Sequence, residues 1–494
     1  MKKQLILGGL SILTLVTCSY GLTPPGTYVL DLALGQLNLT SSGLVFPATA
    51  GTLNKPRGVV VDAASRKVFV ADTENNRVLR YASATALNTG ASAEAVFGQG
   101  TFSNADLNQP TAILGLQKPS AIFFDHLGRL WVTDTYNHRV LMFNNALTSG
   151  NQPMPSKVLG QADLSITTKP TAAAANKLLF PSGVWVEAND RLWVVDGFNR
   201  VLRFNAVTSK TNGADADGVL GQPDFITSTA RSTDARTIKT FTVGGDEQSS
   251  LVVSSTGDLF VASFRENRVL RFNNAGTLAN NAAANSVLGQ PSFTASVNSS
   301  AVNTRSINGD DGFNLTIAPD DKLWVSGTSL NYVIPFEMTS TEAIDFTPGN
   351  ILGGNIYLDG LMLSKENQDS FNSQRSFYFD SVGSLWVADA MNNRVVRLSA
   401  PASIVERVKP VLTLGKFVKS TKAAKVTLKG RASDASGIKK VNYRIGRGPF
   451  KMATGTTKWS FKANLVKGMN RIVIVATDAK GNVSLDKVVT IKRR

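Results

Sequence analysis

Two acidic pairs are the residues of this chain that could hold a divalent cation: Asp246 with Glu247, and Asp310 with Asp311. Carboxylate oxygens are the ligands that hard divalent cations prefer, and two such pairs brought together could form one site. Both pairs precede short apolar runs that read as strands, so we expect them in loops at strand ends. Our main prediction is a protein without a bound metal, and these four residues are the candidate metal ligands of the alternative.

Other groups that do chemistry are scarce. The chain has only two histidines, His126 and His138, which cannot complete a three-histidine metal site. No Gly-x-Ser-x-Gly elbow and no P-loop occurs, and the single cysteine, Cys18, lies close to the N-terminus. We therefore assign no catalytic residue and no cofactor, and the balance favours a protein that is not an enzyme.

An aspartate followed four or five residues later by an arginine recurs along the chain. The guanidinium group of arginine binds a carboxylate well through paired, charge-assisted hydrogen bonds. A catalytic residue needs to occur only once, whereas these residues recur, so we interpret them as scaffold. The predicted structural pairs are Asp72 with Arg77, Asp134 with Arg139, Asp196 with Arg200, and Asp389 with Arg394.

These pairs belong to a longer repeat. Six segments share an aromatic residue at intervals of 62 to 67 residues: Phe69, Trp131, Trp193, Phe260, Trp324 and Trp386. A second element, Leu-Gly-Gln or a near relative, recurs with the same period. A fixed period of this size indicates a repeat architecture.

Each repeat contains four short strand-like runs separated by turn residues. Six such repeats predict an all-β fold, a six-bladed β-propeller over residues 28–400. A Leu-Gly-Gln run precedes the first full repeat and none follows the sixth. We therefore expect residues 29–35 to supply the outer strand of the last blade, which closes the ring and removes an exposed edge.

The segments resemble NHL repeats, most closely in KPRGVVVD followed by VFVADTENNRVLRY in the first repeat. The fifth repeat departs most, with Gly327 and Tyr332 where the others carry Asp and Arg. The resemblance implies a six-bladed NHL-type propeller with a central channel. Some related propellers are metal-assisted lyases or lactonases, which gives the alternative function for the four acidic residues.

The N-terminus is typical of an export signal, predicted over residues 1–19. Lys2 and Lys3 precede a short apolar core that is too short to span a bilayer, and no later stretch predicts a transmembrane helix. The LVTC sequence resembles a lipobox, with Thr17 where Gly, Ala or Ser is usual. Lipidation of Cys18 and ordinary cleavage nearby both remain open. The expected location is extracellular, periplasmic or attached to the outer membrane.

The period stops after residue 400, and residues 401–410 read as a linker. Residues 411–494 alternate strand-like runs with turns and resemble bacterial Ig-like domains in Gly430–Asp434, Trp459–Phe461 and Ala476–Asn482. From Pro401 onward 22 basic residues face 4 acidic ones, a net charge of +18, so the rest of the chain carries −2. This charge favours attachment to an anionic surface polymer, with solubilising lysines as the alternative. Because 15 of the 22 are lysines, we do not expect sequence-specific nucleic-acid binding.

Loops at the propeller rim are the candidate ligand-binding residues. Mixed aromatic, amide and charged side chains on a rigid rim suit the recognition of a peptide, a protein or a glycan. The residues that we expect the rim to display are Glu74, Asn75, Tyr136, His138, Phe198, Arg265, Glu266, Met391 and Asn392. The sequence thus predicts an exported binding or scaffold protein. The alternative for the rim is that these are ordinary loop residues without a binding role.

Overall fold

The computed structural model describes residues 29–108, 111–240, 248–297, 312–319, 322–327, 332–336, 374–399, 409–434, 436–446, 448–479, 482–484 and 487–494. The predicted signal segment with Cys18, the four acidic candidates Asp246, Glu247, Asp310 and Asp311, and most of the predicted linker lie outside these residues. Where the chain is described it forms β-strands and short 3-10 helices. None of these helices has the length and apolar character needed to cross a membrane.

Most strands group into four-stranded antiparallel sheets that follow chain order. The first sheet contains β2 (Gly58–Val61), β3 (Lys67–Asp72), β4 (Arg77–Ser83) and β5 (Ala95–Phe97). The second contains β6 (Pro119–Phe124), β7 (Leu130–Asp134), β8 (Arg139–Phe143) and β9 (Lys157–Leu159). The third contains β10 (Gly183–Val186), β11 (Leu192–Asp196), β12 (Arg200–Phe204) and β13 (Gly218–Leu220). The fourth contains β15 (Leu251–Val253), β16 (Leu259–Ser263), β17 (Arg268–Phe272) and β18 (Ser286–Leu288).

The fifth sheet differs at its inner edge. It contains β19 (Gly312–Ile317), β20 (Leu323–Gly327) and β21 (Tyr332–Phe336), and β14 (Gln248–Ser249) pairs with β19 in parallel. The segment around Gly353, where the repeat predicts an outer strand, lies outside the described residues.

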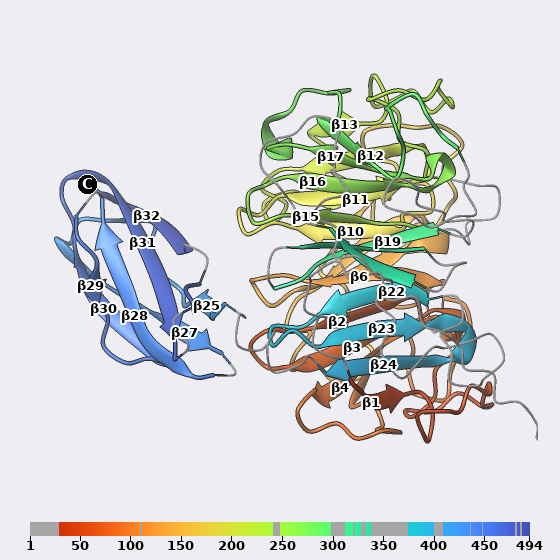
Figure 1. Cartoon of the computed structure of the whole chain (residues 1–494), viewed down its shortest axis with the longest axis horizontal. Coiled ribbons are helices and arrows are strands. Elements are labelled where there is room, and N and C mark those ends of the chain that lie inside the picture. The colour runs from red at the N-terminus through yellow and green to blue at the C-terminus, as the bar shows by residue number, and fades with distance from the viewer. Residues whose placement is uncertain are drawn as a thin grey trace, which may run out of the picture.

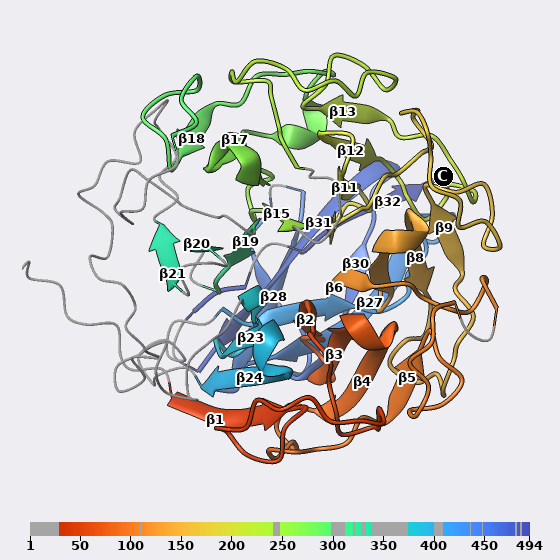
Figure 2. The same cartoon turned by 90° about the vertical axis from the view of Figure 1, so that its right-hand side faces the viewer.

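The last sheet closes the ring. It contains β22 (Gln374–Phe379), β23 (Leu385–Asp389) and β24 (Arg394–Ser399), and its outer strand is β1 (Val29–Leu34). The pairing of β1 with β24, from Val29 opposite Ser399 to Leu34 opposite Val395, confirms the expected closure by the N-terminal run. The sheets stand around a common axis with their first strands innermost, which is the arrangement of a β-propeller (Figure 2).

The core lies between neighbouring sheets. One cluster joins Val60 and Phe69 of the first sheet to Ile122 and Val132 of the second. The Phe69 ring stacks on Phe124 with centroids 5.3 Å apart, so the recurring aromatic fills the space between two blades. Strands such as β7 and β11 are buried on both faces, and they therefore read as nearly continuous apolar runs.

Residues 409–494 form a separate two-sheet body, here called the C-terminal sandwich (Figure 1). One sheet contains β25 (Val411–Leu414), β27 (Lys425–Ser433) and β30 (Lys458–Asn464). The other contains β26 (Ser420–Thr421), β32 (Lys487–Arg493), β31 (Gly468–Asp478), β28 (Ile438–Ile445) and β29 (Lys451–Met452). Leu428, Trp459 and Ile472 share one core cluster, so the two sheets pack face to face.

Candidate functional site

The loops between second and third strands lie on one face of the propeller, here called the turn face. Among the described loops, four contain a single 3-10 turn: η1 (Thr73–Asn75), η2 (Thr135–Asn137), η3 (Phe264–Glu266) and η6 (Ala390–Asn392). The turn face points away from the C-terminal sandwich (Figures 1 and 2). The predicted rim residues all belong to these loops or to the matching loop of the third sheet.

A buried ion pair lies beneath each of four of these turns. Arg77 Nε donates to Asp72 Oδ2 at 2.7 Å, and both side chains are fully buried. The other carboxylate oxygen of Asp72 accepts the backbone N–H of Asn54 at 2.6 Å, and Arg77 Nη2 donates to the carbonyl of Thr52 at 2.9 Å. The corresponding distances are 2.7 Å for Asp134 with Arg139, 2.8 Å for Asp196 with Arg200, and 2.7 Å for Asp389 with Arg394. These four carboxylates are buried and bonded within the scaffold, so none of them is displayed on the turn face.

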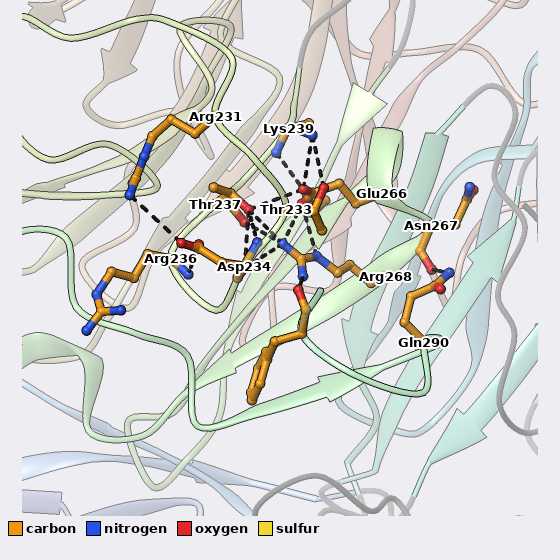
Figure 3. Close-up of polar contacts among 12 residues, drawn as sticks. Arg231, Thr233, Asp234, Arg236, Thr237, Lys239, Glu266, Asn267, Arg268 and Gln290 are labelled. Atoms are coloured by element: carbon orange, nitrogen blue, oxygen red, sulfur yellow. Dashed lines mark hydrogen bonds and ion pairs between the residues drawn. The ribbon is translucent and has the colours of Figure 1, made fainter. Parts of the chain in front are cut away.

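The fourth sheet makes the same interaction with different residues. Ser263 stands where four of the other repeats have aspartate, and the carboxylate comes instead from Glu266. Glu266 Oε2 accepts from Arg268 Nη2 at 2.6 Å and from Ser263 Oγ at 2.7 Å, while Lys239 Nζ lies 3.4 Å from its other oxygen (Figure 3). Glu266 is completely buried, which corrects the expectation that the rim displays it.

His138 also belongs to the scaffold. It has a left-handed backbone with φ of 56°, as do Asn76 and Asn393 at the same place in their repeats. Its Nδ1 accepts the backbone N–H of Phe180 at 3.1 Å, just as Asn76 Oδ1 accepts the N–H of Lys118 at 2.9 Å. The imidazole therefore replaces an asparagine amide as the acceptor that joins two neighbouring blades.

The His138 ring is buried, with 3% of the residue exposed. Burial lowers the pKa of His138 to about 4, and the charge of Lys169 acts in the same direction. The ring is thus neutral at physiological pH, as the accepted hydrogen bond requires. His126, the other histidine, lies in the exposed loop between β6 and β7 at the opposite end of those strands, so the two do not form a pair.

Three other candidate rim residues are buried rather than displayed. Asn75 Nδ2 donates to Asp72 at 2.9 Å, and Asn392 Nδ2 makes the equivalent bond to Asp389 at 2.9 Å. Phe198 packs in a small apolar cluster and is 8% exposed. The expectation of display is wrong for these residues because each turn folds its side chains inward to satisfy the buried ion pair or fill the space beside it.

Four candidates do reach the surface: Glu74, Tyr136, Arg265 and Met391. Glu74 and Tyr136 come together through Lys118, whose Nζ lies 3.3 Å from the Glu74 carboxylate and 5.1 Å from the centre of the Tyr136 ring. Arg265 and Met391 belong to the loops of other sheets. The structure thus brings two of the nine candidates to one place.

Tyr136 belongs to a group that sequence reasoning missed, here called the platform: Lys118, Tyr136, Lys169 and Phe180. The Tyr136 and Phe180 rings meet edge to face with centroids 5.2 Å apart, and Lys169 Nζ lies 5.1 Å from the centre of the Phe180 ring. Both lysines keep charged ends on partly exposed aromatic rings. Phe180 has a φ of 43°, a strained conformation for a bulky residue that its hydrogen bond to His138 maintains.

The innermost strands of the propeller surround a small central cavity. A cavity of about 80 Å³ lies between the innermost strands and is lined near its turn-face end by Arg57, Ser182, Asn314 and Arg375. Among the described residues no three His, Cys, Asp or Glu side chains are grouped as a metal would require. The acidic candidates for a metal lie outside those residues, so the metal alternative stays a prediction.

The recurring glutamine of Leu-Gly-Gln has a structural role that was not predicted. Gln99 Nε2 donates to the carbonyl of Asn76 at 3.1 Å, and Gln290 Nε2 donates to that of Asn267 at 3.0 Å (Figure 3). The side chain therefore holds the left-handed residue of its own blade. Its recurrence at the repeat period was the signal that could have shown this.

Comparisons with known proteins agree with the β-propeller fold. Residues 53–81 match the NHL repeat family, and a search of curated proteins finds no match. The chain is similar to a virginiamycin B lyase from Staphylococcus aureus solved with quinupristin, at 12% identity and a TM-score of 0.36 over 88% of this chain and 98% of that one. It is similar to the WD40 β-propeller domain of Doa1, at 10% identity and a TM-score of 0.36 over 76% of this chain and 98% of that one. It is also similar to a protein of unknown function from Bacteroides thetaiotaomicron, at 12% identity and a TM-score of 0.43 over 75% of this chain and 76% of that one. The chain thus carries an NHL repeat in a β-propeller, and similarities this weak give no activity.

Proposed function

We propose that the chain is an exported, non-enzymatic binding protein. In this proposal a six-bladed NHL-type propeller recognises a peptide, protein or glycan on its turn face, and a basic Ig-like domain attaches the protein to an anionic surface. The export signal proposed for residues 1–19 would place it outside the cytoplasm, whether or not Cys18 carries lipid.

The platform is the observation that carries the recognition half of the proposal. Among the described residues of the turn face, the repeat aspartates are engaged in buried ion pairs and His138 in a hydrogen bond between blades. The side chains that do reach the surface include two aromatic rings flanked by two lysines. Aromatic faces stack on sugars and apolar side chains, and lysines favour an acidic partner.

The attachment half rests on charge. The described part of the C-terminal sandwich contains many exposed lysines, among them Lys419, Lys422 and Lys425. A strongly positive domain attached to a nearly neutral propeller is drawn to anionic surfaces, and salt screens this attraction.

Binding of the full chain to arrays of acidic glycans and peptides tests the recognition half. Lys169→Glu and Tyr136→Ala should each weaken the strongest interactions at least tenfold. Phe450→Ala, which removes a partly exposed aromatic ring from the C-terminal sandwich, is the matched control and should leave them unchanged. Equal binding by all four proteins would refute recognition at the platform. Stoichiometric metal in the purified protein, lost on Asp310→Ala, would instead support the lyase or lactonase alternative.

A further inference from the structure

Cations and exposed apolar side chains gather at one end of the C-terminal sandwich, here called the basic tip. Its cations are Lys419, Lys422, Lys425, Lys467, Lys492 and Arg494, and its apolar side chains are Val418, Val466 and Met469. They come from three separate segments: the stretch that leads into β27, the loop that joins β30 of one sheet to β31 of the other, and the C-terminus. The sequence alone does not place these segments together.

Backbone pairing assembles the basic tip. The N–H of Lys492 donates to the carbonyl of Lys419 at 3.0 Å, and the N–H of Arg494 donates to that of Thr421 at 2.9 Å. The N–H of Leu465 donates to the carbonyl of Ala424 at 2.8 Å, which brings the β30–β31 loop beside the same segment. Asn470 then holds this loop from within, because its Oδ1 accepts the N–H of Val466 and its Nδ2 donates to the Val466 carbonyl. The basic tip is therefore a built surface rather than a loose tail.

Charge is distributed along the long axis of the sandwich. The described acidic residues of this body, Asp434 and Asp478, follow or end β27 and β31 at their far ends. The nine residues of β27 run from Lys425 to the residue before Asp434, so these two lie roughly 30 Å apart. The chain enters from the propeller at that acidic end, where Val411 pairs with Ser433. The basic tip is thus free of described acidic groups and lies opposite the connection to the propeller.

Apolar exposure distinguishes the basic tip from an ordinary lysine-rich surface. Val418 is 54% exposed, Val466 68% and Met469 65%. Met469 pairs directly with Lys492 across the strands, so an apolar and a charged side chain project side by side. A soluble polyanion would contact only the cations. The headgroup region of an anionic bilayer attracts the cations and also accepts the apolar side chains.

We infer that the basic tip docks on the surface of an anionic phospholipid bilayer. Val466 and Met469 enter the headgroup boundary, and the surrounding lysines contact lipid phosphates. This inference rests on the proposed attachment to an anionic surface, and it names both the surface of the protein and its partner. The sandwich would then hold the turn face of the propeller away from the membrane.

Binding of the full chain to phosphatidylglycerol-containing vesicles at physiological salt, with phosphatidylcholine vesicles as reference, tests the inference. Lys422→Gln/Lys467→Gln should weaken binding about 25-fold, since each cation near an anionic membrane contributes about fivefold. The matched control, Lys439→Gln/Lys458→Gln, removes the same charge near the acidic end and should change binding less than about threefold. Val466→Ser/Met469→Ser should weaken vesicle binding severalfold but leave binding to heparin unchanged.

The outcomes separate the inference from the function that it deepens. Equal losses in the two lysine pairs would show attachment by net charge alone, which refutes the basic tip but keeps the anionic surface. Unchanged vesicle binding by Val466→Ser/Met469→Ser would refute the bilayer and favour an acidic polysaccharide. No binding of the unaltered chain to vesicles or heparin would refute attachment altogether. Recognition by the platform would still be tested separately, by binding to the glycan and peptide arrays.

Discussion

Replacing His138 by asparagine should remove a pH-dependent part of the stability of the propeller. The pKa of His138 is about 4 in the folded chain and 6.5 in an unfolded one. Between these values the unfolded chain binds a proton that the folded chain excludes, so stability is complete above pH 6.5 and falls as the pH decreases toward 4. At about 1.4 kcal/mol for each pH unit, the loss is at most about 3 kcal/mol, and residual solvation of the ring makes it smaller.

Asparagine should fill the position without this dependence. Asn76 already makes the same bond at 2.9 Å in the first blade, so His138→Asn should keep its stability at neutral pH within about 1 kcal/mol. His138→Ala should cost about 1–3 kcal/mol at neutral pH, because the N–H of Phe180 would lose its acceptor. This cost should shrink as the pH falls toward 4, because the alanine variant has no imidazole to titrate.

Denaturant unfolding across this pH range, followed by tryptophan fluorescence, measures the effect. The informative quantity is the difference in unfolding free energy between the unaltered chain and His138→Asn, because the titration of carboxylates cancels in it. His126→Asn is the control for the other histidine. A difference that stays constant from neutral pH to pH 4, or an NMR titration of His138 near its ordinary pKa of 6.5, would refute the reasoning.

Three further predictions concern the scaffold, and denaturant unfolding checks each. Asp72→Ala should cost about 3–5 kcal/mol, because it leaves a buried arginine without its counter-ion; a cost below 1 kcal/mol would contradict a structural ion pair. Glu266→Ala should cost as much, whereas the exchange Ser263→Asp/Glu266→Asn, which restores the pattern of the first repeat, should recover most of the loss. Gly160→Ala should cost more than Gly128→Ala: both have positive φ, but a Cβ at Gly160 would lie 2.7 Å from a leucine carbon and one at Gly128 meets nothing. Equal costs would show that backbone strain alone matters.

The all-β propeller could be predicted from the repeat period, because the strands of each repeat are encoded by local sequence patterns. Apolar runs, turns and the recurring aromatic residue are readable within about sixty residues, and the extra Leu-Gly-Gln run indicated the closing strand that β1 forms with β24. Alignment of the repeats also contained two signals that the rim prediction overlooked. His138 follows Asn137 where Asn76 follows Asn75, and Glu266 appears in the one repeat whose aspartate is replaced by Ser263.

Which side chains reach solvent was decided only by the tertiary structure. The turn of η1 directs Asn75 inward because Asp72 and Arg77 need partners in a space closed by loops that are distant in the sequence. The platform likewise joins Tyr136 to Phe180 across two blades. A loop position predicts exposure on average, but burial of a given atom depends on the neighbouring blade.

The same division holds for charge. Composition determined that the C-terminal part is strongly basic, because charge is a sum over residues and needs no fold. The gathering of Lys422, Lys467 and Arg494 at one end, with Asp434 and Asp478 at the other, depended on strand pairing between segments far apart in the chain. Register is a long-range property, set by which apolar faces can be buried together, and it decides where each charge lies.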